Sequence, residues 1–287
     1  MFSRNFYYRI KYQLEKKAPF QFFFYFILDR IQHPFNKSQK KLYRNLHKDY
    51  LKKKRASTDY FSINTYYWNK IISKNFKKFS YLEIGSWEGN SALFILKNYT
   101  TDNVVCVDLW EKSSEINKNF ENFKLNMEEF KNKFSFFRET SDNFFINNKD
   151  KFDIIYIDGS HESIQVYKDI NNAWNFLNIG GILICDDYFY GNIYTESGNV
   201  PAEAINKFIK EKSNLKIISV NNSQIFLKKI KQRGEPVIFV SGHFANFELM
   251  SMEIVKKGID LATIYRPLNN IFLNFYMEYL REKFICK

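Results

Sequence analysis

A regular alternation of two kinds of segment between residues 81 and 228 limits the folds that this chain can adopt. Helix-length amphipathic stretches separate the first five of seven apolar runs of strand length, which are Tyr81–Gly85, Val104–Asp108, Phe134–Phe137, Ile154–Asp158, Ile182–Asp186, Leu215–Val220 and Ile225–Lys228. This alternation predicts an α/β domain whose largely parallel sheet is covered by helices on both faces. Asn221-Asn222, a pair typical of tight turns, joins the last two runs, so we expect the sheet to end in an antiparallel hairpin.

A glycine-rich turn follows the first run, at the edge where the carboxyl ends of parallel strands form a binding crevice. Its sequence, Glu83-Ile-Gly85-Ser-Trp-Glu-Gly89, differs from the Gly-x-Gly-x-x-Gly fingerprint of dinucleotide-binding proteins. Gly85 and Gly89 would let the backbone approach a ligand closely, and the helix beyond them offers free N–H groups. Asp108 ends the second run and can accept both hydroxyl groups of a ribose. Together these residues predict a site for a ligand that contains a ribose.

Three acidic residues and one histidine follow the fourth and fifth runs. Asp158 and His161 follow the fourth, and Asp186-Asp187 ends the fifth. Three carboxylates in one crevice repel one another unless they are protonated or share a cation, so we expect a hard divalent metal as their partner. Such a metal could hold a substrate hydroxyl and lower its pKa, with His161 as the proton acceptor. The alternative is that Asp186 or Asp187 caps the following helix and that His161 lies on the surface.

The excess of positive charge is confined to the N-terminal segment. The chain carries 43 Lys and Arg residues against 31 Asp and Glu residues, a net charge of +12. Residues 1–55 hold 15 of the basic residues and three of the acidic ones, so the rest of the chain is neutral. Net positive charge is typical of nucleic-acid-binding proteins. Because the body of this chain has no net charge, we expect no specific nucleic-acid partner.

The same segment contains Phe20–Leu28, a run that is almost entirely apolar. About 20 residues are needed to span a bilayer, so this run is too short. Asp29 and Arg30 follow it without the small-residue cleavage site of a signal peptide. Two alternatives remain for this basic and aromatic segment. Either it lies on an anionic membrane surface, or it forms a helical extension that packs its phenylalanines on the body and exposes a basic face.

The cysteine content indicates a reducing compartment. Only three cysteines occur, and their wide separation excludes both a disulfide framework and the spacing of metal ligands. We therefore expect a cytoplasmic protein that touches the inner membrane at most peripherally, through residues 1–55.

Four motifs in this order resemble class I S-adenosylmethionine-dependent methyltransferases. They are YLEIGSWEGNSALFIL, VVCVDLWE, FDIIYIDGSHESIQVYKDI and NIGGILICDDY. They are most similar to the group that includes metal-dependent sugar O-methyltransferases of macrolide and aminocoumarin pathways. The resemblance covers about residues 57–230. It implies a Rossmann-like sheet, S-adenosylmethionine as the cofactor, and transfer of a methyl group to an oxygen.

The resemblance also implies roles for individual residues. Seven residues are expected to contact the cofactor. Glu83, Gly85 and Gly89 would line its methionine part, Asp108 would hold its ribose, and Trp110, Ser141 and Asp142 would lie near its adenine. Asp158, Asp186 and Asp187 occupy the positions at which metal-dependent members of the family have magnesium ligands. His161 or Asp158 is then the candidate base.

Residues 231–287 resemble a different family, the lipid A biosynthesis acyltransferases. The similar stretch is PVIFVSGHFANFELMSMEIVKKGIDLATIYRPLNN. His243 and Glu248 match the His-x-x-x-x-acid motif of that family, which implies a histidine base oriented by a carboxylate. The segment predicts a small α/β fragment that covers only a middle portion of the family and is marginal as an independent core. This favours a gene-fusion or frameshift product, or an appended packing module, over acyl transfer.

These observations combine into one expectation with two alternatives. We expect a basic aromatic extension (residues 1–56), a methyltransferase domain (57–230) and a partial acyltransferase-like segment (231–287). The expected function is the transfer of a methyl group from S-adenosylmethionine to a hydroxyl of a sugar or glycan, assisted by a divalent metal such as magnesium. The alternatives are acyl transfer to a lipid A precursor by the C-terminal segment, and a non-catalytic module that binds a membrane surface.

Overall fold

The computed structural model describes residues 4–110, 114–190, 200–221, 223–231 and 279. The chain divides into two compact units, Met1–Gln232 and Arg233–Lys287, and the elements described below belong to the first. The predicted C-terminal fragment, with His243 and Glu248, lies outside the described residues.

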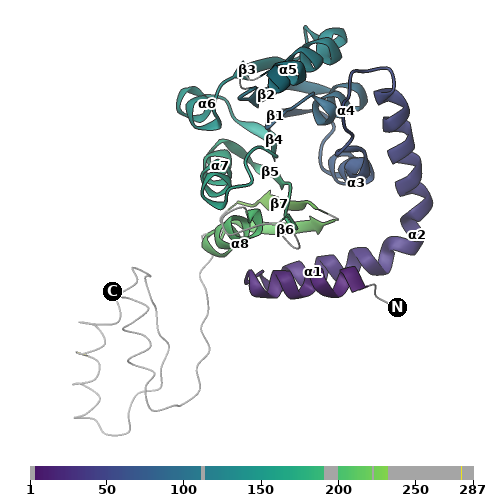
Figure 1. The fold of residues 1–287 in the computed structure, drawn as a ribbon. Coiled ribbons are helices and arrows are strands. Elements are labelled where there is room, and N and C mark those ends of the chain that lie inside the picture. Colours follow the sequence, from purple (N-terminus) through teal and green to yellow (C-terminus); the bar gives the residue numbers. More distant parts are fainter. Residues whose placement is uncertain (1–3, 111–113, 191–199, 222, 232–278, 280–287) are drawn as a thin grey trace, which may run out of the picture. The chain divides into compact units, whose positions relative to one another are not determined.

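Seven strands form one sheet at the centre of the first unit (Figure 1). They are β1 (Phe79–Ile84), β2 (Thr101–Asp108), β3 (Ser135–Arg138), β4 (Phe152–Ile157), β5 (Leu177–Cys185), β6 (Leu215–Val220) and β7 (Ile225–Lys229). Their order across the sheet is β3-β2-β1-β4-β5-β7-β6. The strands β1 to β5 are parallel, whereas β7 pairs antiparallel with both β5 and β6. The predicted parallel sheet with a terminal antiparallel hairpin is confirmed.

This strand order creates a topological switch point between β1 and β4. The chain moves outward from β1 through β2 to β3, and then crosses back to place β4 on the other side of β1. Ile84 of β1 is in register with Ile157 of β4, so both strands end at the same level. In sheets of this kind ligands bind outside the carboxyl ends of the strands at the switch point. We therefore expect the binding site to lie around the residues that follow Ile84 and Ile157.

Asn221 builds the turn that joins β6 to β7. Its backbone N–H donates to the carbonyl oxygen of Gln224 over 3.0 Å. Its side-chain Oδ1 accepts from the backbone N–H groups of Ser223 (3.1 Å) and Gln224 (2.8 Å). An Asn side chain that bonds to the backbone in this way mimics a further turn of backbone. The hairpin consequently holds Gln224 at a defined position beside the ends of β5 and β4.

Helices cover both faces of the sheet. One layer comprises α1 (Arg4–Glu15), α6 (Ser141–Asn147), α7 (Ser163–Phe176) and α8 (Pro201–Glu211). The other comprises α3 (Thr65–Asn75), α4 (Asn90–Asn98) and α5 (Ser114–Met127), with short 3-10 helices at Ser62–Asn64 and Glu128–Phe130. Neighbouring strand residues alternate between the two cores, with Leu82 in the first and Tyr81 in the second. A parallel sheet covered on both faces explains why the strands read as continuous apolar runs.

The long helix α2 (Phe20–Leu51) belongs to both layers. Phe22 and Phe26 in its first turns pack into one core, where both rings contact Phe189, whereas Leu51 in its last turn packs into the opposite core. Between these ends α2 contacts the edge strand β6, and Figure 1 shows the helix bending along that side of the sheet. Pro34, which has no N–H to donate, lies inside the helix and interrupts its hydrogen bonds, which accounts for a bend. The helix thereby covers a strand edge that would otherwise present unpaired backbone groups.

Buried polar contacts fix α1 on the body. Gln13 Nε2 donates to the carbonyl oxygen of Tyr188 over 2.7 Å, and Gln13 Oε1 accepts from Asn206 Nδ2 over 3.1 Å. The Tyr12 hydroxyl donates to the carbonyl oxygen of Tyr190 over 2.7 Å. The N-terminal extension therefore packs on the body as a helical extension, which was one of the two alternatives.

His47, near the end of α2, is enclosed by aromatic rings. Only 4% of its surface is exposed, and its ring centroid lies 5.5 Å from those of Phe61 and Phe94, both nearly edge-on. Its Nε2 atom is buried and has no hydrogen-bond partner. Burial lowers the pKa of His47 to about 4, since the charged ring would lose its hydration.

We expect His47→Phe to make the free energy of unfolding less sensitive to acid. The unfolded chain takes up a proton on His47 near pH 6.5, whereas the folded chain does so only near pH 4. The contribution of the neutral ring is thus fully present above pH 6.5 and is lost as the pH falls toward 4, by about 3 kcal/mol. Urea unfolding at several pH values across this window measures the difference in slope. His33→Phe, which replaces an exposed histidine, is the control, and it should keep most of the decrease in the free energy of unfolding that the wild type shows in acid. Parallel slopes for wild type and His47→Phe would contradict the expectation.

Candidate functional site

Two cavities open at the carboxyl ends of the parallel strands. The first has a volume of about 490 Å³ and the second about 670 Å³. Residues that line both are Gly85, Trp87, Asp158 and Gly159. Gly85 follows β1 and Asp158 follows β4, so the cavities adjoin at the topological switch point. The site therefore has two compartments that share one wall.

The first cavity collects the residues predicted to contact ribose and adenine. Asp108, Trp110, Ser141 and Asp142 all line it. The Asp108 carboxylate accepts the backbone N–H of Trp87 over 2.8 Å and that of Trp110 over 2.9 Å. Burial raises the pKa of Asp108, and these N–H groups oppose the rise because they favour the charged form. The structure thus brings the predicted nucleoside residues of β2 and α6 to one cavity.

The turn after β1 passes so close to β4 that only glycine fits at one position. Gly85 has φ of +90°, and a Cβ added there would lie 2.1 Å from the carbonyl oxygen of Asp158. No side chain can occupy that space without moving one strand end away from the other. The first glycine of the predicted turn is therefore required by the contact between β1 and β4.

Two tryptophans and one aspartate around the cavities have positive φ angles, which glycine adopts most readily. The φ angles are +48° at Trp87, +35° at Trp110 and +53° at Asp187. Such conformations are uncommon for residues with a Cβ, and aromatic residues adopt them rarely. Residues held in sparsely populated backbone regions cluster at binding and catalytic sites, where the surrounding structure fixes them. Each of the three lines at least one of the two cavities.

Glu83 and Gly89 lie behind the turn. Glu83 is fully buried, and its carboxyl contacts the hydroxyls of Ser91 and, over 3.1 Å, of Tyr81. Burial raises the pKa of Glu83 to about 8, so its carboxyl is mostly protonated at neutral pH. Gly89 caps α4 with φ of +84°, and a Cβ there would lie 3.1 Å from Cδ2 of Phe123 in α5. Their predicted contact with the methionine part of a cofactor stays a prediction.

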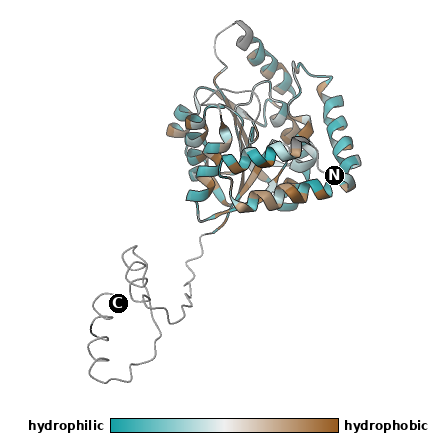
Figure 2. Cartoon of the chain, turned by 60° about the horizontal axis from the view of Figure 1, so that its bottom comes forward, coloured by the Kyte–Doolittle hydropathy of each residue, from teal (hydrophilic) through white to brown (hydrophobic). Residues whose placement is uncertain are grey.

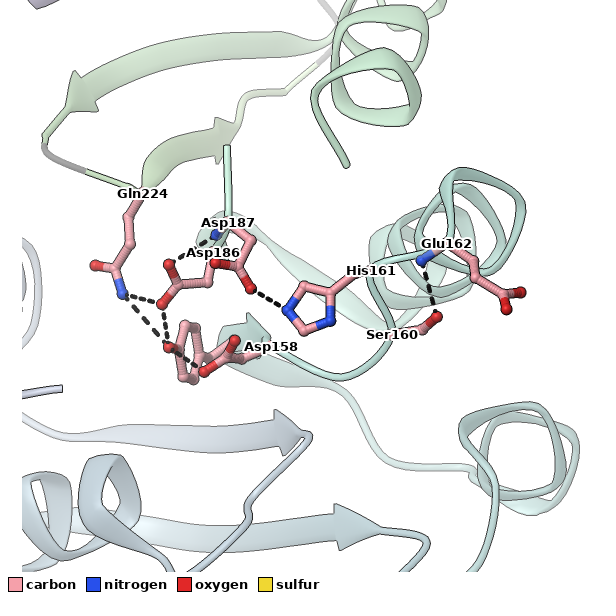
Figure 3. A network of polar contacts seen from close by, with 8 residues as sticks. Asp158, Ser160, His161, Glu162, Asp186, Asp187 and Gln224 are labelled. Carbon is pink, nitrogen blue, oxygen red and sulfur yellow. Dashed lines mark hydrogen bonds and ion pairs between the residues drawn. The ribbon is translucent and has the colours of Figure 1, made fainter. Parts of the chain in front are cut away.

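In the second cavity one tyrosine joins two carboxyls (Figure 3). The Tyr156 hydroxyl lies 2.8 Å from Asp158 Oδ2 and 2.5 Å from Asp186 Oδ2, and Gln224 Nε2 donates to the same Asp186 oxygen over 2.7 Å. A phenol has one proton to donate, so the second of these short contacts requires a proton on a carboxyl. Desolvation at this site and the neighbouring carboxyls raise the pKa of Asp158 well above its ordinary value.

His161 and Asp187 form a dyad at the same cavity. His161 Nε2 lies 2.7 Å from Asp187 Oδ2, and Figure 3 shows the ring directed at that carboxylate. The imidazole also stacks on the Tyr190 ring, with centroids 4.3 Å apart and planes 25° apart. The hydrogen bond to Asp187 raises the pKa of His161. A histidine oriented by a carboxylate and an aromatic ring is suited to accept a proton through its other ring nitrogen.

The residues predicted as metal ligands are brought together only in part. Asp158 and Asp186 share the Tyr156 hydroxyl, but the Asp187 carboxylate is turned to His161. Within the residues that the structure describes, no group of three or more His, Cys, Asp and Glu side chains has the arrangement of a metal site. The side chains as placed do not fit the predicted magnesium site, because only two of the three carboxylates converge and the third is directed at the histidine. Metal binding stays a prediction from the resemblance.

Two polar residues that contact the carboxyls of the second cavity were not predicted from the sequence. Tyr156 lies inside an apolar strand, and Gln224 lies in the hairpin turn, where Trp68 Nε1 donates to its Oε1 over 2.8 Å. Side chains two residues apart on a strand point to the same side. The spacing of Tyr156 and Asp158 was therefore a signal that could have identified the tyrosine. No comparable signal connects Gln224 with Asp186, which are 38 residues apart.

Two family models match the chain. Residues 82–188 match the model of a methyltransferase domain, and residues 194–287 match that of bacterial lipid A biosynthesis acyltransferases. The first match runs from β1 through the end of β5 and includes the residues shared by both cavities. The second match includes α8, β6 and β7, which belong to the sheet and helix layers described above. The acyltransferase candidates within it, His243 and Glu248, lie outside the described residues.

Individual proteins are similar to parts of the chain. An uncharacterized protein of Acanthamoeba polyphaga mimivirus is 27% identical over 125 residues, which are 41% of this chain and 56% of that protein. This chain thus spans little more than half of the length of that relative. A proposed O-methyltransferase from Klebsiella pneumoniae is similar in structure, with a TM-score of 0.50, 10% identity, and coverage of 70% of this chain and 97% of that one. An O-methyltransferase from Bacillus cereus, solved with S-adenosylhomocysteine, has a TM-score of 0.47 and 14% identity, with coverage of 71% and 97%.

These comparisons confirm the predicted fold. The sheet order, the family model over residues 82–188 and the Klebsiella pneumoniae structure agree on a Rossmann-like methyltransferase sheet.

We expect Gly85→Ala to destabilise the chain far more than Gly180→Ala. Both glycines have nearly the same φ, +90° and +86°, but a Cβ at Gly180 meets no atom within 4 Å. Gly180→Ala therefore adds only backbone strain, about 1 to 2 kcal/mol. Gly85→Ala adds the clash with Asp158 and should lower the free energy of unfolding by more than about 4 kcal/mol. Urea unfolding measures both variants, and equal losses would show that the close approach of β1 to β4 is not rigid.

Proposed function

We propose that this chain transfers a methyl group from S-adenosylmethionine to a hydroxyl of a sugar or glycan. Residues 82–188, which match the model of a methyltransferase domain, would carry out this reaction. The observation that carries the proposal is the pair of adjoining cavities. One is lined by candidate nucleoside-binding residues, the other contains a carboxylate-oriented histidine, and both meet at Gly85 and Asp158. A donor in the first cavity and an acceptor in the second would react at their shared wall.

The first cavity and the turn beside it offer groups that suit the cofactor. Asp108 can accept the ribose hydroxyls, while Trp110, Ser141 and Asp142 line the space beyond it. Asn90 Oδ1, at the start of α4 and on the wall of the second cavity, is buried without a hydrogen-bond partner and is available to the amino group of a methionine moiety that extends past the shared wall. When bound, S-adenosylmethionine supplies an electrophilic methyl group on a positively charged sulfur. The residues around the cofactor need only orient that methyl group toward the second cavity.

The second cavity would hold the acceptor hydroxyl and take its proton. His161, fixed by Asp187 and Tyr190, accepts the proton as the hydroxyl oxygen forms its bond to carbon. Bound S-adenosylmethionine would supply the methyl group, and the electron pair of the broken C–S bond would stay on sulfur, which would become neutral. Asp158 lies at the junction of the cavities and can orient the acceptor through a hydrogen bond. Alignment of the two reacting groups supplies much of the acceleration.

The lining of the second cavity supports a sugar as the acceptor. Three aromatic side chains present exposed surface there: Tyr60 is 77% exposed, Trp87 47% and Tyr190 39%. Aromatic rings can pack on the C–H faces of a sugar ring, while nearby carboxylates such as Asp158 and Asp187 accept hydrogen bonds from its hydroxyls. Cavities that combine apolar walls with a few polar groups bind small ligands selectively.

We expect the full chain to bind S-adenosylmethionine and Asp108→Ala to weaken that binding. Removing the carboxylate removes charge-assisted hydrogen bonds to the ribose, which should raise the Kd about 10- to 100-fold. Isothermal titration calorimetry measures the Kd, and the melting temperature of each variant shows whether the fold is retained. A parent chain that binds no S-adenosylmethionine would overturn the proposed function.

We expect His161→Ala to lower kcat for methyl transfer about 10²- to 10⁴-fold without changing the Kd for S-adenosylmethionine. Asp187→Asn should lower kcat less, because it disturbs only the orientation of the histidine. Glu162→Gln is the matched control, because Figure 3 shows Glu162 directed away from the carboxyl group cluster. Mass spectrometry of a panel of mono- and oligosaccharides detects a gain of one methyl group. Full activity of His161→Ala would remove the histidine from the mechanism, and methylation of non-sugar hydroxyls alone would overturn the acceptor class.

A further inference from the structure

The outer face of α2 carries an exposed apolar stripe. Its members are Phe20, Phe24, Ile27, Ile31 and Phe35, with exposed fractions of 87%, 59%, 38%, 57% and 82%. Spacings of four, three, four and four residues place them on one side of the helix. The buried residues of the same turns, Phe22 and Phe26, lie on the opposite side. Figure 2, coloured by the hydropathy of each residue, shows hydrophobic and hydrophilic stretches alternating along the N-terminal helices. The sheet and its helix layers do not cover this stripe, and the proposed methyl transfer does not use it.

A cavity with a basic lining borders the stripe on one side. The cavity has a volume of about 400 Å³, and α2 contributes Leu28, Gln32 and Asn36 to it. Each of these directly follows a stripe residue in the sequence. The lysines that line the cavity come from α3 and the β6–β7 hairpin and are Lys70, Lys74, Lys216 and Lys228. Asp29 also lines it and is paired with Lys40 over 3.1 Å.

The other side of the stripe is basic as well. Lys37, Lys41 and Arg44 are exposed and recur at spacings of four and three residues, so they share one side of α2. At about 3.6 residues per turn, that side lies across the stripe from Leu28, Gln32 and Asn36. Residues 1–55 contain 15 basic residues and three acidic ones. Two of those acids, Asp29 and Asp49, already pair with lysines of the same helix or its end.

We propose that α2 docks the chain on an anionic phospholipid surface. The stripe would enter the boundary between headgroups and acyl chains, and the lysines on its two sides would contact lipid phosphates. An apolar stripe with cations beside it is the pattern of helices that lie in the membrane interface. Anionic lipids attract such basic segments. None of the described helices has the length and apolar character needed to cross a membrane.

Charge also argues against a second copy of the chain on this stripe. Two such copies would bring together two segments that each carry an excess of 12 positive charges. Like charges in a contact destabilise it, and the segment offers almost no acidic residues to compensate. A lipid surface supplies the negative charge that a second copy lacks.

Co-sedimentation of the full chain with vesicles tests this docking. We expect binding to vesicles of phosphatidylcholine mixed with phosphatidylglycerol, and much weaker binding to phosphatidylcholine alone. The triple variant Phe20→Ser, Phe24→Ser, Ile31→Ser should lower the partition coefficient about tenfold or more, because less apolar surface is buried. The pair Lys70→Glu, Lys74→Glu should lower it about fivefold or more for each lysine removed.

Matched controls separate the stripe from general surface effects. Ile146→Ser with Ile164→Ser removes apolar side chains that are 79% and 74% exposed on α6 and α7, and should leave binding unchanged. Lys133→Glu with Lys149→Glu reverses exposed charges elsewhere and should have at most a small effect. Circular dichroism and melting temperature confirm that each variant folds. The proposal is overturned if the parent does not prefer anionic vesicles, if the stripe variant binds as well as the parent, or if the stripe variant only converts a dimer to a monomer.

Discussion

The close approach of β1 and β4 at the switch point is the constraint on which the site depends. A side chain at Gly85 would meet the carbonyl oxygen of Asp158, so the two strand ends can lie this near only because the turn begins with glycine. The same approach makes Gly85 and Asp158 part of both cavities. A donor and an acceptor in these cavities would therefore be separated by little more than the width of two strand ends. The packing of the backbone alone therefore places the two cavities side by side, as a group transfer requires.

The carboxyl groups of the second cavity are stabilised by the scaffold in two different ways. Asp158 and Asp186 share the hydroxyl of Tyr156, and Gln224 connects Asp186 to the fully buried Trp68. Asp187 instead pairs with the only histidine among the described residues that line this cavity. The first arrangement is a chain of connected, mostly half-buried hydrogen bonds that fixes the side chains of the cavity floor. The second orients a histidine that can exchange a proton with a ligand. The adjacent residues Asp186 and Asp187 thus have different roles, the first in stabilising the cavity and the second in orienting the proton acceptor.

The sequence predicted the sheet and the strand ends well, because parallel strands buried on both faces leave a strong apolar pattern. Asp108, Asp158 and His161 could be assigned to the crevice because each lies at the end of a strand or within a few residues after it. The hydrogen-bond partners of these carboxylates could not be predicted from the sequence. Gln224 reaches Asp186 only because β7 inserts between β5 and β6, and that strand order leaves no local signal. Glu83 was expected to line the cofactor site, but the sequence does not show that its side chain points behind the turn, to Ser91 and Tyr81.

The N-terminal segment shows most clearly what a sequence leaves undetermined. A run of adjacent phenylalanines contains residues for every side of a helix, so its composition is equally consistent with packing on the body and with binding to a surface. In the structure Phe22 and Phe26 pack inward while Phe20 and Phe24 face outward. The two alternatives were therefore never exclusive, because each uses a different side of one helix. The inward side anchors α2 across the edge of the sheet, and this anchoring is what holds the outward side, with its basic borders, in a fixed orientation toward any surface that it meets.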